Sequence, residues 1–262
     1  MATPESPVPI GPPFSTGEVK LVHKVPYFPL SEPSQDPERE RQRRIVGKVE
    51  EVDTNDWRAL NEFASRYFEL LTEPDNLTHF TGVPDNVEEL KETLKTKGKH
   101  GLAVFNKLDE VIGFAMIDDP AKDELDGKLS KFGIIKNLQN IRPSNEETTE
   151  GDDVARPRNV GRQTLGKVLE WAFNKNTHDG NERRRIDAFI MIAADGGKQN
   201  IDGWTRMYTL FNDAGAEIVY VNRDTAWISS KGEKIKVSGD SMRMKLSKED
   251  WESNKYKFIL NN

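Results

Sequence analysis

Three arginines and two glycines stand close together between residues 156 and 167, and they are the residues of this sequence best suited to binding a charged ligand. The stretch continues into residues at helical spacing that form one apolar face: Leu165, Val168, Leu169, Ala172 and Phe173. That periodicity predicts a helix. The first turn of a helix offers backbone N–H groups without partners and a partial positive charge, which together suit a phosphate. We therefore interpret the stretch as an anion-binding turn, with pyrophosphate as the favoured ligand.

A P-loop is one alternative for this turn. Gly161 and the pair Gly166–Lys167 have its spacing, but Val168 occupies the position of the Ser or Thr that holds magnesium. A P-loop also follows a buried strand, whereas residues 150–157 are mostly polar. Because Gly166 and Lys167 fall inside the helical pattern, we interpret the P-loop match as accidental. A basic helix start that is simply exposed to solvent is the other alternative.

The composition excludes several classes of site. The chain has 262 residues and a net charge of −6, which argues against general nucleic-acid binding. It contains no cysteine, so disulfides, zinc–thiolate sites and cysteine nucleophiles are excluded, and a reducing cytoplasm is the expected location. The four histidines lack metal-ligand spacing, so no metal site is predicted. No apolar run has the length of a membrane span, and the N-terminus lacks the apolar core of a signal peptide.

Prolines and charge divide the chain into three parts. Residues 1–44 are rich in proline and predict a partly extended arm, because proline disfavours both helix and central strand. Residues 45–250 predict a globular domain, and residues 251–262 predict a tail. Within the domain, residues 140–153 are polar and acidic and indicate an insertion.

Hydrophobic periodicity predicts the elements of the domain in order. A strand from Ile45 precedes two helices, and an antiparallel hairpin, a polar loop up to Ser130 and another strand precede the anion-binding turn with its helix. The elements with predicted bounds are a helix at 85–97, the hairpin at 101–106 and 111–117, strands at 131–138, 185–193, 217–221 and 242–246, a helix around 204–211, and a small hairpin at 226–229 and 234–237. This order predicts an α+β fold with a mixed, mostly antiparallel sheet flanked by helices.

The order resembles that of the GCN5-related N-acetyltransferases from Ile45 to about Leu246. The turn carries a motif of this family, since Arg158-x-x-Gly161-x-Gln163 resembles its pattern of Gln or Arg, two residues, Gly, one residue, and Gly or Ala. Gln163 departs from the final small residue. Gly113 resembles a glycine in the third strand of the family, and residues 211–216 resemble the Tyr-x-x-x-Gly-Phe ending of its fourth helix.

The resemblance implies an acyl-coenzyme A site between two strands that splay apart, here residues 131–138 and 187–193. The pyrophosphate would lie on the turn, mainly against backbone N–H groups. Backbone N–H groups of the first strand would bind the thioester carbonyl, which stabilises the negative charge that develops there. The residues implied in cofactor binding are Ile134, Ile135, Lys136, Arg158, Asn159, Val160, Gly161, Arg162, Gln163 and Thr164.

The implied chemistry also needs a base for the ammonium of the acceptor and an acid for the leaving thiolate. For the base we consider Asp195, which follows a predicted buried strand, and Asp118 and Asp119, which end the hairpin near the expected acceptor mouth. Each of the three is alternatively a turn or cap residue. For the acid, Phe211 stands in the position of the family's tyrosine and cannot donate a proton. Tyr208 lies one turn earlier on the same face and is the candidate, with a core tyrosine as the alternative.

The sequence thus predicts an N-acyltransferase that moves acetyl from acetyl-coenzyme A to a primary amine by direct attack in a ternary complex. The expected acceptor is a small cationic amine or a protein amine, because acidic loops near the mouth would attract cations. A homodimer through the N-terminal arm is a further expectation, and no nucleic-acid or membrane partner is predicted. Because the tyrosine is missing, the alternative is a coenzyme-binding or protein-interaction module with weak or no catalysis.

Overall fold

An eight-stranded sheet forms the centre of the molecule in the computed structural model, which describes residues 28–72, 83–120, 126–134, 138, 160–195, 198–199, 201–222, 226–230, 233–237 and 239–258. The strands lie in the order β1 (Val46–Glu51), β2 (Lys99–Asn106), β3 (Val111–Asp118), β4 (Asp126–Ile134), β5 (Arg185–Asp195), β10 (Gly239–Ser247) and β7 (Glu217–Asn222), and the short β6 (Lys198–Gln199) pairs with β5. A separate hairpin consists of β8 (Ala226–Ser230) and β9 (Glu233–Val237).

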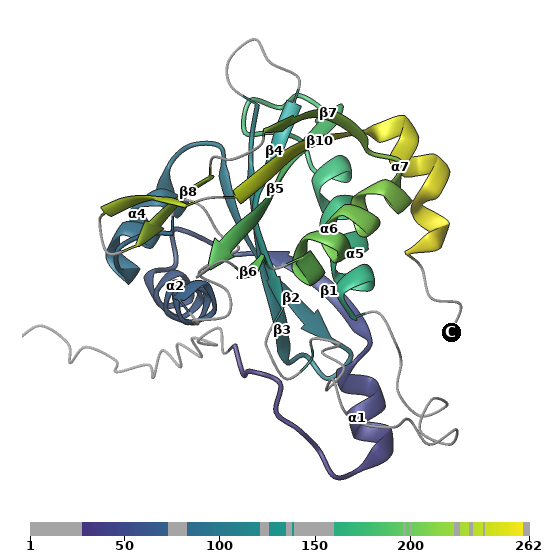
Figure 1. Ribbon diagram of the computed structural model, residues 1–262. Helices are drawn as coiled ribbons and strands as arrows, with labels where there is room; N and C mark the ends of the chain where they lie inside the picture. The colour runs from purple at the N-terminus through teal and green to yellow at the C-terminus, as the bar shows by residue number, and fades with distance from the viewer. Residues whose placement is uncertain are drawn as a thin grey trace, which may run out of the picture.

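Neighbouring described strands of the sheet are antiparallel except for one parallel pair, β4 and β5. Helices cover both faces: α2 (Trp57–Thr72) and α4 (Val87–Lys95) lie on one side, and α5 (Val160–Asn174) and α6 (Ile201–Ala214) lie on the other (Figure 1). The predicted mixed, mostly antiparallel sheet flanked by helices is therefore confirmed. Helices α2, α4, α5 and α6 and the β2–β3 hairpin form where the apolar periodicity predicted them.

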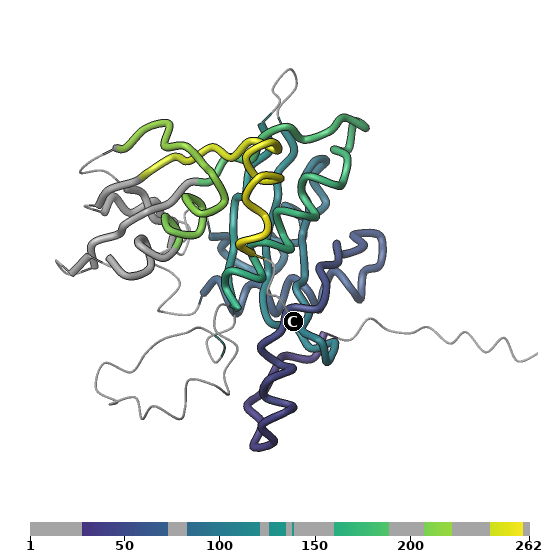
Figure 2. Tube along the Cα trace, turned by 90° about the vertical axis from the view of Figure 1, so that its right-hand side faces the viewer, coloured from purple at the N-terminus to yellow at the C-terminus, as the bar shows by residue number. Residues whose placement is uncertain are grey.

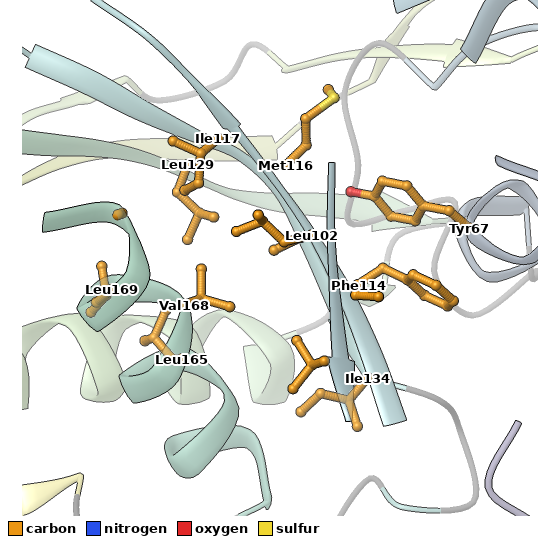
Figure 3. Packing of buried hydrophobic residues seen from close by; sticks show 14 of the residues in the cluster. Tyr67, Leu102, Phe114, Met116, Ile117, Leu129, Ile134, Leu165, Val168 and Leu169 are labelled. Carbon is orange, nitrogen blue, oxygen red and sulfur yellow. The ribbon is translucent and has the colours of Figure 1, made fainter. Parts of the chain in front are cut away.

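Apolar side chains from both helical layers meet the sheet in one core (Figure 3). On one face, Leu165 and Val168 of α5 lie against the side of the sheet that carries Ile117. On the other face, Tyr67 of α2 stacks on Phe114 with 5.3 Å between the ring centroids. Burying a large apolar side chain contributes roughly 1.5–3 kcal/mol. The repeat of apolar residues every three or four positions therefore holds α2 and α5 on the sheet.

The described end of the N-terminal arm packs on the domain. Phe28 is buried in the core, and Leu30 forms an isolated bridge with Val111 at the start of β3. Arg43, the last residue of α1 (Pro37–Arg43), is only 1% exposed. Both views place this segment at the lower edge of the sheet, with α1 projecting below it (Figures 1 and 2). Residues 28–44 are thus part of the packed body, and residues 1–27 of the predicted arm lie outside the described residues.

The chain remains packed well beyond residue 250. After β10 come α7 (Lys248–Asn254) and the 3-10 turn η2 (Lys255–Lys257), and the buried rings of Trp251 and Phe258 lie 5.2 Å apart between centroids. A Cβ atom added at Gly166 would lie 2.8 Å from the Cβ of Phe258, so glycine is needed for this close approach. Gly166 therefore lies inside α5 against the C-terminal segment, which removes the P-loop alternative.

The start of β4 differs from the prediction. We expected a polar loop up to Ser130 and a strand at 131–138, but β4 spans Asp126–Ile134. In the first half of the strand, Lys128 is exposed and Leu129 is buried, so a charged face alternates with an apolar one. That charged face hid the strand from a reading based on hydrophobicity. Residues 135–137, at the other end of the predicted strand, lie outside the described residues.

Candidate functional site

The parallel strands β4 and β5 are paired at one end only. Pairs form from Asp126 with Arg185 to Leu129 with Ala188. Both strands continue, β4 to Ile134 and β5 to Asp195, and no further β4–β5 pair forms between their described residues. The two strands of an otherwise continuous sheet thus separate, and beyond Leu129 and Ala188 their described residues form no pair with each other. This separation is the splay that the resemblance implied.

A β-bulge in β4 marks the point of separation. In the pairing with β3, Ile117 lies opposite Leu129 and Met116 lies opposite Lys131, so Ser130 is an extra residue. The Ser130 hydroxyl is within 3.2 Å of the carbonyl oxygen of Met116 and of Asp118 Oδ1. A bulge bends its strand and leaves a residue unpaired, and bulges are over-represented beside active sites. Here the bulge lies directly after Leu129, the last residue of β4 that pairs with β5.

The N-terminus of α5 lies at the open end of this gap. Ile134 ends β4, and a Cβ atom added at Gly161, in the first turn of α5, would lie 3.3 Å from Ile134 Cδ1. Alternate backbone N–H groups of β4 beyond the bulge face away from β3, as antiparallel pairing requires. The gap is therefore bordered by strand donors along its length and by the positive end of a 15-residue helix at its mouth.

Two side chains of the first turns of α5 anchor the helix to neighbouring elements. Arg162 pairs with Asp213 of α6, and its guanidinium lies 5.3 Å from the ring centroid of Phe258. The Gln163 side chain accepts from the backbone N–H of Val46 at 3.1 Å. The turn therefore presents backbone groups, and Gln163 departs from the small residue of the family pattern because it braces β1.

The other predicted cofactor residues divide into two groups. Val160, Gly161 and Thr164 lie in the first two turns of α5, where Val160 and Thr164 are buried, and Ile134 ends β4 beside them. The residues outside the described part of the chain are Ile135, Lys136, Arg158 and Asn159. The structure thus brings Ile134, the last residue of β4, close to the residues of the predicted turn that are described.

The neighbours Asp118 and Asp119 point to opposite faces of the sheet. Asp118 Oδ2 lies 2.6 Å from Lys99 Nζ on the α2 face, and its carboxylate also receives the bond from Ser130 at the bulge. Asp119 lies on the α5 face, where its Oδ1 accepts from Arg183 Nη2 at 2.5 Å. Only Asp118 is therefore attached to the point where β4 and β5 separate.

Asp119 is held in the charged form by its neighbours. Burial alone would raise the pKa of this carboxyl, but the backbone N–H of His178 and the charges of Arg183 and His100 outweigh burial and lower the pKa. A carboxylate that is already engaged by three groups and is difficult to protonate is poorly suited to be a general base. We therefore assign Asp119 to the framework of the fold.

The remaining catalytic candidates lie farther along the chain. Asp195 is the last residue of β5 and pairs with Lys198 of β6, and its side chain is outside the described atoms. Tyr208 is partly buried against the core on α6, whereas Phe211 of the same helix is fully buried. Phe211 therefore fills the core at the position where the family pattern has tyrosine.

Two residues of the site were missed by sequence reasoning. Tyr67 was counted only as part of the apolar face of its helix, yet its hydroxyl is fully buried and has no hydrogen-bond partner among the described residues. Lys131 was counted only as the start of a strand, yet burial lowers the pKa of its ammonium group. A lone tyrosine or lysine in a periodic segment gives no sequence signal of this kind, because the signal depends on what packs around it.

Two further classes of site are not seen in the described part of the chain. The His, Asp and Glu side chains described there form no group that could hold a metal ion. The described helices include none with the length and apolar character that crossing a membrane requires.

Solved structures with the same fold exist. The structure matches spermidine N-acetyltransferase from Vibrio cholerae, solved in complex with CoA and spermine, with a TM-score of 0.52 and 11% identity over 78% of this chain and 97% of that chain. A variant of spermidine N-acetyltransferase from the same organism matches with a TM-score of 0.48 and 12% identity, over 78% of this chain and 95% of that chain. No protein-family model matches the sequence, and no curated protein matches it significantly.

Proposed function

From its GCN5-related N-acetyltransferase fold, we propose that this protein is an N-acyltransferase that uses acetyl-coenzyme A and a small primary amine. The observation that carries the proposal is the gap between β4 and β5, which opens after Leu129 and Ala188 and has the N-terminus of α5 at its mouth. A long ligand with a pyrophosphate at one end and a reactive group at the other fits an arrangement with an anion site at the mouth and strand donors leading inward.

The cofactor would bind mainly through the backbone. Its pyrophosphate would lie on the first N–H groups of α5, where the helix dipole stabilises negative charge. The acyl-bearing arm would then follow β4 from Ile134 toward Ser130, a path of about 13 Å at the usual rise of a strand. The thioester would come to rest beside the bulge, where backbone N–H groups of β4 can bind its carbonyl oxygen.

Acyl transfer would proceed by direct attack. The acceptor ammonium loses a proton to a base, its nitrogen attacks the thioester carbonyl, and the oxyanion formed is held by the β4 N–H groups. The attack forms the C–N bond. Collapse of the oxyanion then restores the carbonyl and breaks the C–S bond, and the thiolate that leaves takes up a proton as the new amide nitrogen loses one. We propose Asp118 as the base because it is bonded to Ser130 at the bulge. Asp195 stays a second candidate for the base, and Tyr208 stays the candidate for the acid.

Calorimetric titration with acetyl-coenzyme A tests the cofactor site. Gly161→Glu would place a negative charge at the mouth, and we expect it to abolish binding by the folded protein. Gly161→Ala is the matched control, because its Cβ would meet only the flexible end of Ile134 at 3.3 Å. We expect the control to bind within about threefold of wild type, well under 1.4 kcal/mol. Absence of binding to the folded wild type, or equal binding by the Glu variant, would overturn the proposal.

A coenzyme-binding module without turnover is the second candidate function. The observation that favours it is the fully buried Phe211, which cannot protonate a thiolate. Tight binding of acetyl-coenzyme A with no transfer to any amine of a broad panel would support this candidate.

A homodimer through the N-terminal arm stays a prediction, and light scattering of a variant that lacks residues 1–27 would test it.

A further inference from the structure

The α2 face of the sheet beside the gap carries rows of charged side chains. Cross-strand partners share one face of a sheet, and Lys99, Asp118 and Lys128 lie opposite one another on β2, β3 and β4. The neighbouring row is Gly101, Met116 and Lys131. A Cβ atom added at Gly101 would meet side chains of α2 and α4, which identifies the face. Lys128 and Lys131 thus flank the bulge on the side opposite α5.

These charges do not balance. On β3, β4 and β5, the described carboxylates of this face each have a cation partner: Asp118 pairs with Lys99, Asp126 with Lys245, and Asp187 with Arg243. Lys128 and Lys131 are the two cations left over, since neither has a carboxylate within ion-pair distance among the described residues. Lys128 is exposed and Lys131 is partly buried. Within the described part of the chain, the two lysines therefore form a positive site that has no ion-pair partner and reaches from solvent to the bulge.

Buried groups beside the lysines are also incompletely satisfied. Burial, helped by the charge of Asp118, raises the pKa of the Tyr67 hydroxyl, which has no hydrogen-bond partner among the described residues. Figure 3 shows this hydroxyl directed toward the part of the sheet that carries Met116, the residue opposite Lys131. Desolvation destabilises the charged form of Lys131. An anion bound against Lys131 would offset that desolvation.

We propose that the acceptor is an amine that also carries an anionic group, of the amino-acid type, and that Lys131 and Lys128 bind this group on the α2 face of β4. The inference rests on the proposed function, because the acceptor must approach the thioester from the face that α5 and the cofactor leave free. The anionic group holds the acceptor beside the bulge, with its amine near Asp118. This charge requirement is the opposite of the cationic acceptor that the acidic sequence segments favoured.

The positive pair also discriminates against a polyamine. The matched spermidine N-acetyltransferase was solved with spermine, whose charge is positive throughout. On this chain, such a ligand would meet two lysines that have no compensating carboxylate among the described residues. Specificity depends on repulsion of the wrong ligand as much as on attraction of the right one. Lys128 and Lys131 would supply both.

A matched series of acceptors tests the inference. We would compare 4-aminobutyrate, its neutral amide and 1,4-diaminobutane, and likewise glycine and glycinamide, by kcat/KM for acetyl transfer from acetyl-coenzyme A. We expect the carboxylate of each pair to be preferred over the amide by about tenfold or more, the change that one lost charge contact of about 1.4 kcal/mol produces. Lys131→Met should reduce this preference to below about threefold. Lys95→Gln, an exposed lysine of α4 away from the gap, should leave it unchanged.

Each outcome decides the inference. Because a buried lysine can affect folding, Lys128→Gln at the exposed position is the second variant, and it should also lower the preference. Fastest transfer to the diamine, unchanged in both variants, would overturn the anionic acceptor and leave the proposed function standing. If no amine is acetylated, the test is calorimetric titration of the CoA-loaded protein with 4-aminobutyrate and with its neutral amide. Equal affinities for the two compounds would overturn the inference. No binding of acetyl-coenzyme A would overturn both proposals.

Discussion

Replacing Asp119 by asparagine should destabilise the fold and leave cofactor binding intact. Asp119 Oδ1 accepts from Nε and Nη2 of Arg183 at 3.1 and 2.5 Å, and Arg183 is fully buried. Nη1 of Arg183 donates in turn to the backbone carbonyls of Ala172 and Lys175 at 3.0 and 2.6 Å. The Asp119–Arg183 pair therefore joins the end of β3 to the end of α5, and asparagine would leave a buried guanidinium without its counter-charge.

The size of the effect follows from the burial. Breaking a buried ion pair by removing one partner costs about 3–5 kcal/mol, because the remaining charge is left uncompensated. With a urea m-value of about 3 kcal/mol/M for a domain of this size, the midpoint should fall by about 1–1.7 M. Asp118→Asn is the matched neighbour, since its partner Lys99 is 30% exposed. Loss of that partly exposed pair should cost at most about 1 kcal/mol.

Urea unfolding followed by tryptophan fluorescence measures both variants. Trp171 reports on the Asp119–Arg183 pair directly, because the Arg183 guanidinium lies 5.4 Å from the centroid of its ring. In the folded Asp119 variant, the affinity for acetyl-coenzyme A should stay within about threefold of wild type. An Asp119 variant with an unchanged midpoint but a rate reduced by about 100-fold would refute this reasoning, because it would identify Asp119 as the base.

Three further predictions concern stability. Burial alone would lower the pKa of His100, but the carboxylates of Glu51 and Asp119 outweigh it and raise the pKa. The charged ring therefore stabilises the fold fully below about pH 6.5, the unfolded value, and this contribution is lost as the pH rises through the folded value. His100→Gln should accordingly lower the urea midpoint more at pH 6 than at pH 9, and equal losses would contradict the assignment. Gly166→Ala should destabilise by about 1–3 kcal/mol in the same assay, since its Cβ would meet the C-terminal segment at 2.8 Å, and no loss would mean that this segment moves freely. Tyr67→Phe should raise the melting temperature, because it removes an unsatisfied buried hydroxyl worth about 1–3 kcal/mol, and a lower melting temperature would reveal a hydrogen-bond partner.

The pattern of apolar residues predicted helices and strands well where they bury one apolar face or a continuous apolar run. The apolar face of α2 and the apolar run of β3 are properties of neighbouring residues, so they could be read directly. Gly215 ends α6 with φ of +96°, a conformation that glycine adopts without strain, as expected for a helix stop. The first half of β4 failed because its outward face is charged. Hydrophobicity cannot distinguish such a strand from a loop.

Side-chain partners that are distant in sequence could not be predicted. Arg162 was interpreted as a phosphate ligand, but its carboxylate partner is Asp213, which belongs to another helix. Gln163 looked like a flaw in the turn motif, but it binds the backbone of Val46, 117 positions away in the chain. A motif records residue types along a helix and gives no information on which elements pack around it. The sequence therefore predicted the helix that follows the turn, and it could not predict the partners of Arg162 and Gln163.

Strand alternation already implied that Asp118 and Asp119 could not both face the same site, because successive residues of a strand point to opposite faces. Only the packing shows which face carries the bulge and which carries the buried arginine.

Binding through the backbone would also explain why so little sequence likeness accompanies the fold. If the cofactor is held by backbone N–H groups of β4 and α5, the requirements are a strand that bends at Ser130 and a helix that starts beside Ile134. Many different side chains can meet those requirements, so an identity of 11% is compatible with the same fold. On the proposed function, the α2 face is the part that would vary with the substrate, since Lys128 and Lys131 would set the charge that an acceptor meets there.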